Sequence, residues 1–211
     1  MNYIICGVIG YLLGSFPTAF ILLKKFKSID IREQGSTNIG ALNSFRVSKS
    51  KMLGVLVLLI DMTKGIAAVW ICWQIFGTNF LNGSISLFFA VLAHNYSPWL
   101  KFKGGRGLAT TAGGALLLSL PLLLLWLFFW VASFLFRRNI QLSSIMSTVL
   151  TTAIIITSYE RINSWSAYPA ENPLWLAIIM GGVLILIMTK HIEPLKNYLK
   201  GQKQILRDNE L

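Results

Sequence analysis

Apolar residues form long runs along the chain, and the polar residues gather in the short stretches between them. A helix needs about 20 mostly apolar residues to cross the hydrocarbon core of a bilayer. The runs that reach or approach this length cover residues 3–23, 52–77, 81–100, 108–136, 142–158 and 173–189. The pattern predicts an all-α, polytopic membrane bundle that forms a single domain over residues 1–211.

The run at 108–136 can be one tilted helix or two short helices that meet at Pro121. Basic residues distinguish the two, because Lys and Arg are enriched in cytoplasmic loops. With two helices and an outer N-terminus, all but two of the 19 Lys and Arg residues fall on the inner side, whereas one long helix divides them between the sides. We therefore predict seven transmembrane helices, a short hairpin at Pro121 and a cytoplasmic C-terminus. Each arm of that hairpin is short for a bilayer and needs local thinning.

The composition of the chain is typical of a membrane protein, and its positive net charge favours anionic partners. The chain is 55% hydrophobic and 13% charged, whereas a soluble domain has about 25% charged residues. The net charge of +11 suits anionic headgroups and anionic substrates. Nucleic acid is disfavoured as a partner, because the basic residues lie in short loops between apolar runs. Cys6 and Cys72 lie inside apolar runs, and we expect them to be small hydrophobic residues without a disulfide.

The first inner loop, residues 24–51, combines glycines with hydrogen-bonding side chains. Ser36, Asn38 and Asn43 offer neutral polar groups, and Arg46 offers a bidentate fork that fits a phosphate. The alternative is a solvated loop that uses Gly, Ser and Asn for its turns.

The second inner loop places cations and glycines just before a helix. It contains Lys103, Gly104, Gly105, Arg106 and Gly107. Free N–H groups at a helix N-terminus form a natural anion site. The alternative is an ordinary basic loop that sets orientation. The spacing of a nucleotide-binding P-loop is absent, so no nucleotide is expected.

Four further polar residues fall within or beside the apolar runs. Asp61 and Lys64 share one helix face, either as a structural ion pair or with Lys64 in the site. His94 and His191 fall near the same inner face as the two loops. No ligand set for zinc and no Ser–His–Asp set is apparent, so neither a metal nor an acyl-enzyme is expected.

At these loops the sequence resembles the bacterial acyl-phosphate:glycerol-3-phosphate acyltransferases of the PlsY type. The similar motifs span nearly the whole chain in the family's order. They are Gly14-Ser15-Phe16-Pro17-Thr18, Asp30-Ile31-Arg32, Gly35-Ser36-x-Asn38-x-Gly40-Ala41-x-Asn43-x-x-Arg46, Asp61-x-x-Lys64-Gly65, Ala93-His94, Phe102-Lys103-Gly104-Gly105-Arg106-Gly107-x-Ala109-Thr110, Leu142-Ser143-Ser144-Ile145 and Lys190-His191.

The resemblance implies an enzyme of phospholipid synthesis in the bacterial plasma membrane, with its active site on the cytoplasmic face. It would transfer a fatty acyl group from acyl phosphate to glycerol 3-phosphate, giving lysophosphatidate and phosphate, without a cofactor. The implied catalytic residues are His191, Ser36 and Asn38. The implied binding residues are Arg46, Lys103, Gly104, Gly105, Arg106, Gly107, Asn43, Ser144, Lys64 and His94.

Some positions depart from the family pattern. Arg106 stands where the family usually has Lys, and Pro194 where it usually has Asn. Ile39 and Leu42 replace a usual Pro and Thr. These differences leave open a diverged paralogue with another hydroxyl acceptor. A separate alternative is a non-catalytic membrane protein that binds or transports an anionic lipid. Such a protein would place its ionisable residues near the bilayer midplane, where only Asp61 and Lys64 are expected.

Overall fold

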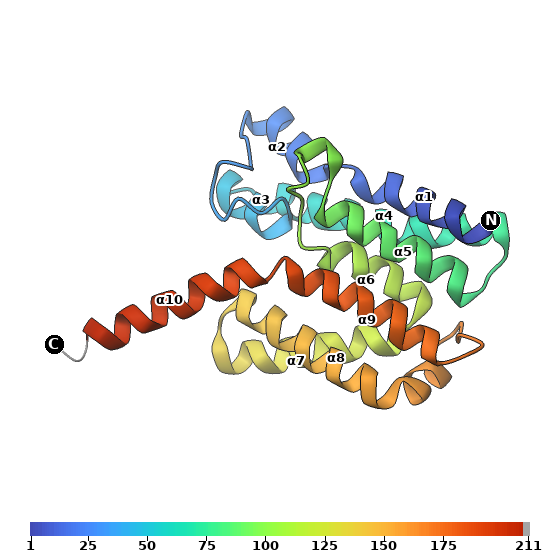
Figure 1. Ribbon diagram of the computed structural model, residues 1–211. Coiled ribbons are helices and arrows are strands. Elements are labelled where there is room, and N and C mark those ends of the chain that lie inside the picture. The colour runs from blue at the N-terminus through green and yellow to red at the C-terminus, as the bar shows by residue number, and fades with distance from the viewer. Residues whose placement is uncertain (209–211) are drawn as a thin grey trace.

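The computed structural model describes residues 1–208, and the side chains of residues 1–200. Over this range the chain is a bundle of α-helices without strands (Figure 1). The α-helices are α1 (Asn2–Ser15), α2 (Thr18–Lys27), α3 (Ala41–Ser48), α4 (Lys51–Phe76), α5 (Phe80–Asn95), α6 (Leu108–Leu118), α7 (Leu120–Arg137), α8 (Ile140–Trp165), α9 (Leu174–Thr189) and α10 (Ile192–Asp208).

The described helices contain fewer clear membrane spans than the seven that the sequence predicts. Four are long and apolar enough to cross a bilayer: α1 together with α2, then α4, α7 and α8. A fifth arises if α9 and the first turns of α10, which bend by 44° at their junction, count as one span. An all-helical membrane protein is thus confirmed, and the number of spans and their orientation stay predictions.

Two breaks between helices differ from the prediction, and each has a local cause. The run at 3–23 is divided into α1 and α2 at Phe16-Pro17, where proline lacks an N–H and disfavours helix in the preceding residue. The long run does contain two helices, but they separate at Ser119 and not at Pro121. Proline fits the first turn of a helix, so Pro121 belongs to the start of α7. The arms are 11 and 18 residues long and therefore unequal. In addition, α5 ends at Asn95 and α8 at Trp165, whereas the apolar runs predict ends at residues 100 and 158.

Helix α5 forms the centre of the bundle, packing along α1, α4, α6 and α9. Its contact with α1 is close because Gly10 and Gly14 present no side chain there. A Cβ at Gly10 would overlap the backbone carbonyl of Ser86, and one at Gly14 would overlap that of Ala90. This glycine pair, four residues apart on one helix face, therefore permits the close packing of α1 on α5.

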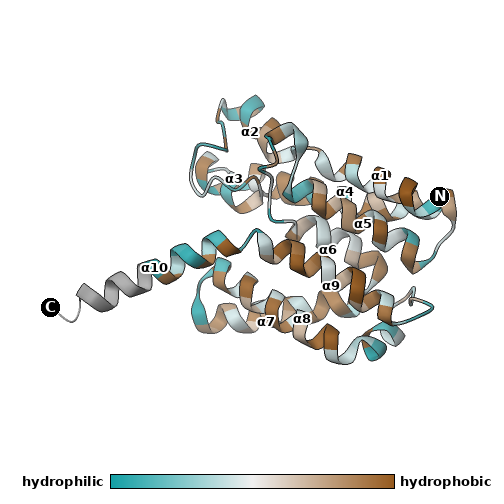
Figure 2. Ribbon diagram, in the orientation of Figure 1, coloured by the Kyte–Doolittle hydropathy of each residue, from teal (hydrophilic) through white to brown (hydrophobic). Residues whose placement is uncertain are grey.

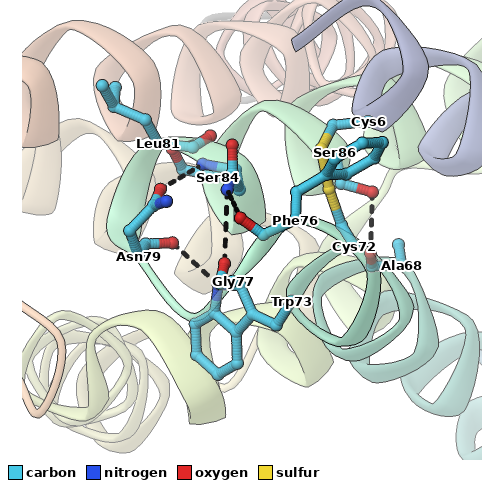
Figure 3. The surroundings of a disulfide bond; sticks show 11 residues. Cys6, Ala68, Cys72, Trp73, Phe76, Gly77, Asn79, Leu81, Ser84 and Ser86 are labelled. Carbon is cyan, nitrogen blue, oxygen red and sulfur yellow. Dashed lines mark hydrogen bonds between the residues drawn. A yellow bond between two sulfur atoms is a disulfide. The ribbon is translucent and has the colours of Figure 1, made fainter. Parts of the chain in front are cut away.

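The expectation that the cysteines are unpaired is wrong, because Cys6 and Cys72 form a disulfide between α1 and α4 (Figure 3). Periodicity within each run could not show that these positions face each other across two helices 66 residues apart in sequence. Beside the bond, the Ser86 hydroxyl donates to the Ala68 carbonyl at 2.7 Å. The disulfide therefore belongs to the tightly packed contact among α1, α4 and α5.

Polar residues gather at one end of the bundle (Figure 2). This end holds α2, α3, the loop at 96–107, the turn between α7 and α8, and the start of α10 (Figure 1). The N-terminus and the segment after α8 lie at the other end. The predicted inner loops are therefore brought together in space, as their shared charge indicates.

Candidate active site

A polar cavity of about 540 Å³ opens at the end of the bundle where these loops meet. Three separate parts of the chain form its wall: the first loop, the glycine-rich loop and the start of α10, with Gln141 of α8 completing it. Its charged lining residues are Arg32, Lys103, Arg106, Lys190 and Glu193. Four cations against one acid make the cavity a strong attractor of anions.

The first loop contributes Ser36, Thr37, Asn38 and Ile39 to this wall. Asn43, buried at the start of α3, holds the loop: its Oδ1 accepts from the Ser36 N–H at 3.0 Å, and its Nδ2 donates to the Gln34 carbonyl at 3.1 Å. Ser36 and Asn38 thus lie where the sequence predicts a site. Asn43 lies behind them and is placed to shape the loop.

Arg32 lies on the same loop and is part of the cavity, although the sequence-based site did not include it. Its guanidinium donates to the Asp30 carboxylate through Nε at 2.9 Å, and it covers the Phe20 ring at 4.7 Å. The bonds from Arg32 lower the pKa of Asp30 to about 2. Its place in the Asp30-Ile31-Arg32 motif was the signal that could have marked it.

The glycine-rich loop is fastened to the end of α5 by its backbone. The N–H of Gly104 donates to the Asn95 carbonyl at 3.1 Å, and the N–H of Gly105 donates to the His94 carbonyl at 3.0 Å. A Cβ at Gly105 would overlap Nε2 of His94. These two N–H groups are therefore used within the protein, and the close packing explains why both positions are glycine.

Lys103 and Arg106 extend from this loop into the cavity wall. Burial lowers the pKa of Arg106, the nearby charge of Arg46 lowers it further, and Glu193 raises it. A guanidinium stays charged at neutral pH even so. Arg106 is thus a partly desolvated cation beside a second cation, and a phosphate would stabilise both. Arg46 itself is exposed on the last turn of α3 and is not part of the cavity wall.

Lys64 and His94 lie behind the glycine-rich loop in a small, separate cavity of about 10 Å³. The Lys64 ammonium pairs with Asp61 at 2.8 Å and donates to the Phe16 carbonyl at 3.1 Å, next to the break between α1 and α2. Nδ1 of His94 is 3.9 Å from the same carboxylate. Asp61, Lys64 and His94 therefore link α4 and α5 to the break between α1 and α2. They do so behind the glycine-rich loop, which faces the main cavity.

His191 occupies the short break between α9 and α10 and is 1% exposed. Its Nδ1 lies 2.8 Å from the Ile187 carbonyl. A carbonyl can only accept, so Nδ1 carries the proton and Nε2 presents a lone pair. Nε2 has no hydrogen-bond partner among the described residues. Burial lowers the pKa of His191 to about 4, and the charge of Arg106 acts in the same direction.

Ser144 is buried on α8 and does not line the cavity. Its hydroxyl donates to the Ile140 carbonyl at 2.9 Å and accepts from Nε1 of Trp130 at 3.1 Å. Gln141, one turn earlier, takes part in the wall instead. The start of α10 adds Pro194, which the sequence analysis marked as a departure from the family pattern. It also adds Glu193 and Asn197, which sequence patterns did not select because the helix is amphipathic and resembles a simple basic tail.

A second, apolar cavity of about 70 Å³ lies among α6, α7, α8 and α9. Leu108, the first residue of α6, belongs to its lining and stands two positions after Arg106. Ile187, one turn before His191, also lines it, and Trp126 of α7 lies in the same wall. The linings of the cationic and apolar cavities thus come close in sequence at two places, at Arg106 and Leu108 and at Ile187 and Lys190.

These features define a helical membrane protein with a cationic cavity and a second, apolar cavity. The family model described as glycerol-3-phosphate acyltransferase matches residues 4–201. The chain therefore belongs to the glycerol-3-phosphate acyltransferase family and is an acyltransferase.

Individual relatives agree over almost the whole length. The glycerol-3-phosphate acyltransferase of the Wolbachia species from Brugia malayi is 36% identical over 97% of this chain and 98% of its own. That of Ehrlichia chaffeensis is 34% identical over 94% of each chain. The crystal structure of PlsY (YgiH), an integral membrane glycerol 3-phosphate acyltransferase in its glycerol 3-phosphate form, is 30% identical. It has a TM-score of 0.76 over 95% of this chain and 94% of that one.

Proposed function

We propose that this chain transfers a fatty acyl group from acyl phosphate to glycerol 3-phosphate, giving lysophosphatidate and phosphate. The observation that carries the proposal is the cavity of about 540 Å³ with Arg32, Lys103, Arg106 and Lys190 around it. Both substrates carry a phosphate, and the cavity offers cations from three segments to bind two such groups. The PlsY relative solved in a glycerol 3-phosphate form supports this acceptor.

The apolar cavity supports a donor with a fatty chain. An acyl phosphate whose phosphate lies near Arg106 could extend its chain past Leu108 toward Trp126. Burial of the chain removes apolar surface from water and fixes the carbonyl carbon near the acceptor. Lys64, His94 and Asn43 would then act on the reaction by positioning the two loops.

The proposed reaction is a direct transfer. The acceptor hydroxyl oxygen bonds to the carbonyl carbon, the bond from that carbon to the phosphate oxygen breaks, and phosphate leaves with the electron pair. The hydroxyl proton would pass to Nε2 of His191, which is neutral at physiological pH. Because His191 is 1% exposed and does not line the cavity, this step requires the wall at Lys190 and Glu193 to open toward the imidazole. Ser36 and Asn38 would donate hydrogen bonds to the developing oxyanion.

A cytoplasmic active site, an outer N-terminus and seven spans complete the proposal. The disulfide supports this orientation, because Cys6 and Cys72 lie near the start of α1 and the end of α4, far from the cavity. Disulfides persist on the periplasmic side of the bacterial membrane and are rare on the cytoplasmic side.

One cavity residue, Pro194, favours an acceptor other than glycerol 3-phosphate as the second candidate. Pro194 lines the cavity where the family usually has Asn, so this wall lacks an amide that could bind a hydroxyl group. A paralogue that acts on another phosphorylated alcohol is therefore the second candidate.

A substrate panel tests both the donor and the acceptor. Purified protein would be given acyl phosphate, an acyl thioester of coenzyme A or an acyl carrier protein as donor, with glycerol 3-phosphate or dihydroxyacetone phosphate as acceptor. We expect equal amounts of lysophosphatidate and phosphate from acyl phosphate and glycerol 3-phosphate. Turnover that required a thioester would refute the proposed donor, and turnover of the other acceptor alone would establish the second candidate.

A further inference from the structure

Helix α10 leaves the bundle with an apolar side uncovered. It extends away from the other helices beyond its first turns (Figure 1), and within the described part of the chain its main contact is with α8. Ile192 is 50% exposed and Leu199 is 51% exposed. Such exposure along a helix that stands apart requires a partner that covers apolar side chains.

The sequence of α10 divides the helix into an apolar face and a basic row. Ile192, Leu195 and Leu199 recur at helical spacing. The basic residues also recur at intervals of four, three and four, which places them in one row: Lys196, Lys200, Lys203 and Arg207. The acidic residues Glu193 and Asp208 stand at the two ends.

The position of α10 identifies what this helix meets. It follows the apolar helix α9 and departs from it at an angle of 44°. A helix that leaves the end of a membrane-spanning segment enters the headgroup region. An amphipathic helix with a basic flank is suited to lie in that region, with its apolar side toward the acyl chains and its cations at the lipid phosphates.

We propose that α10 is an interfacial helix that binds the anionic phospholipid surface of the membrane. Charge complementarity selects this occupant, since four cations in a row match phosphate headgroups and would repel the same row on a second copy. The first turns of α10 contribute Glu193, Pro194 and Asn197 to the cavity. Binding of α10 to the lipid surface therefore also holds one wall of the cavity. This inference does not depend on the proposed reaction.

A fluorescent probe on the apolar face tests the inference in the full chain. Leu199→Cys, labelled with NBD under non-reducing conditions that preserve the native disulfide, would be reconstituted in phosphatidylcholine vesicles with and without about 30 mol% phosphatidylglycerol. The matched control is Gln204→Cys, which by helical spacing lies about 140° away from position 199. The probe at 199 should show a blue-shifted emission with phosphatidylglycerol, and the probe at 204 should not.

A charge variant distinguishes binding of α10 to anionic lipid from contact of α10 with a second copy of the chain. Each basic residue contributes about fivefold to partitioning on an anionic surface, so Lys196→Gln/Lys200→Gln/Lys203→Gln should reduce binding roughly a hundredfold and abolish the shift at 199. An unchanged shift in this triple variant, or one that grows with protein-to-lipid ratio and not with phosphatidylglycerol, would overturn the proposal. The second result would assign the face to another copy of the chain. A probe at 199 that reports water in every vesicle would overturn it as well.

Discussion

The buried pair of Asp61 and Lys64 offers the sharpest test of the structural account. Lys64→Met keeps the length and apolar character of the side chain but leaves the Asp61 carboxylate without its cation. Asp61 is 3% exposed, and Lys64 approaches its carboxylate at 2.8 Å. Removal of one member of a buried pair costs about 3–5 kcal/mol, because the remaining charge is uncompensated. We expect Lys64→Met to lose stability by that amount.

The double variant Asp61→Asn/Lys64→Met is the matched control. It removes both charges, and replacement of a whole buried pair by neutral groups is often close to neutral in stability. Midpoints of unfolding in detergent, compared for the wild type, the two single variants and the double variant, give the coupling between the residues. The double variant should be more stable than Lys64→Met.

Enzyme turnover, measured on the same four proteins, gives a second and independent test. Lys64 contacts Asp61 and the Phe16 carbonyl and lies outside the main cavity, so a stable double variant should still turn over substrate. A Lys64→Met variant as stable as wild type would refute the ion-pair argument. A stable double variant with no turnover would instead show that the pair is needed for the reaction itself, through contact with substrate or through the position of the loops.

Three further predictions follow from the site. Arg106→Gln should lower kcat/KM roughly ten- to a hundredfold, because a charge-assisted hydrogen bond contributes about 1.5–3 kcal/mol. Steady-state kinetics measure this loss, and Arg106→Lys, which keeps the positive charge, should lose far less. His191 is neutral in the folded protein down to pH about 4, whereas it protonates near 6.5 when unfolded. Its contribution is therefore complete above pH 6.5 and is lost, by about 3 kcal/mol, as the pH falls toward 4. The Tm of His191→Asn in detergent should depend less on pH between 7 and 5 than that of wild type, and equal slopes would contradict the burial of a neutral imidazole. Cysteines at Thr78 and Ser164 should react with an impermeant thiol reagent in intact cells and one at Glu33 should not; the reverse pattern would invert the proposed orientation.

Charge and hydropathy were sufficient to predict the helical membrane fold and the gathering of the basic loops at the end that holds the candidate site. Each signal can be read from a single segment. The bilayer requires about 20 apolar residues in a spanning helix, and Lys and Arg are enriched in the loops on the cytoplasmic side. The cations Lys103 and Arg106 were found in the same way, because a glycine-rich basic stretch before a helix has a local physical meaning.

The remaining features depend on contacts between distant segments. The Cys6–Cys72 disulfide requires two helices to present facing positions at one depth. The break at Phe16-Pro17 could have been read from the proline, but its carbonyl accepts from Lys64, 48 positions along the chain. Ser144 belongs to a family-like motif, yet its hydroxyl is hydrogen-bonded to Trp130 and does not line the cavity. Gln141, which lies outside that motif, does line it. Tertiary packing decides which member of a polar segment faces the site.

The most direct test of the central claim is whether the acyl group passes to the acceptor without a stop on the protein. Initial rates would be measured while acyl phosphate and glycerol 3-phosphate are both varied, and protein incubated with acyl phosphate alone would be analysed by mass spectrometry. We propose that the two phosphates bind together in one cationic cavity, and we therefore expect intersecting double-reciprocal lines and an unmodified protein. Parallel lines with a stoichiometric acyl adduct, formed at a rate that matches turnover, would contradict it and identify the modified residue as the nucleophile.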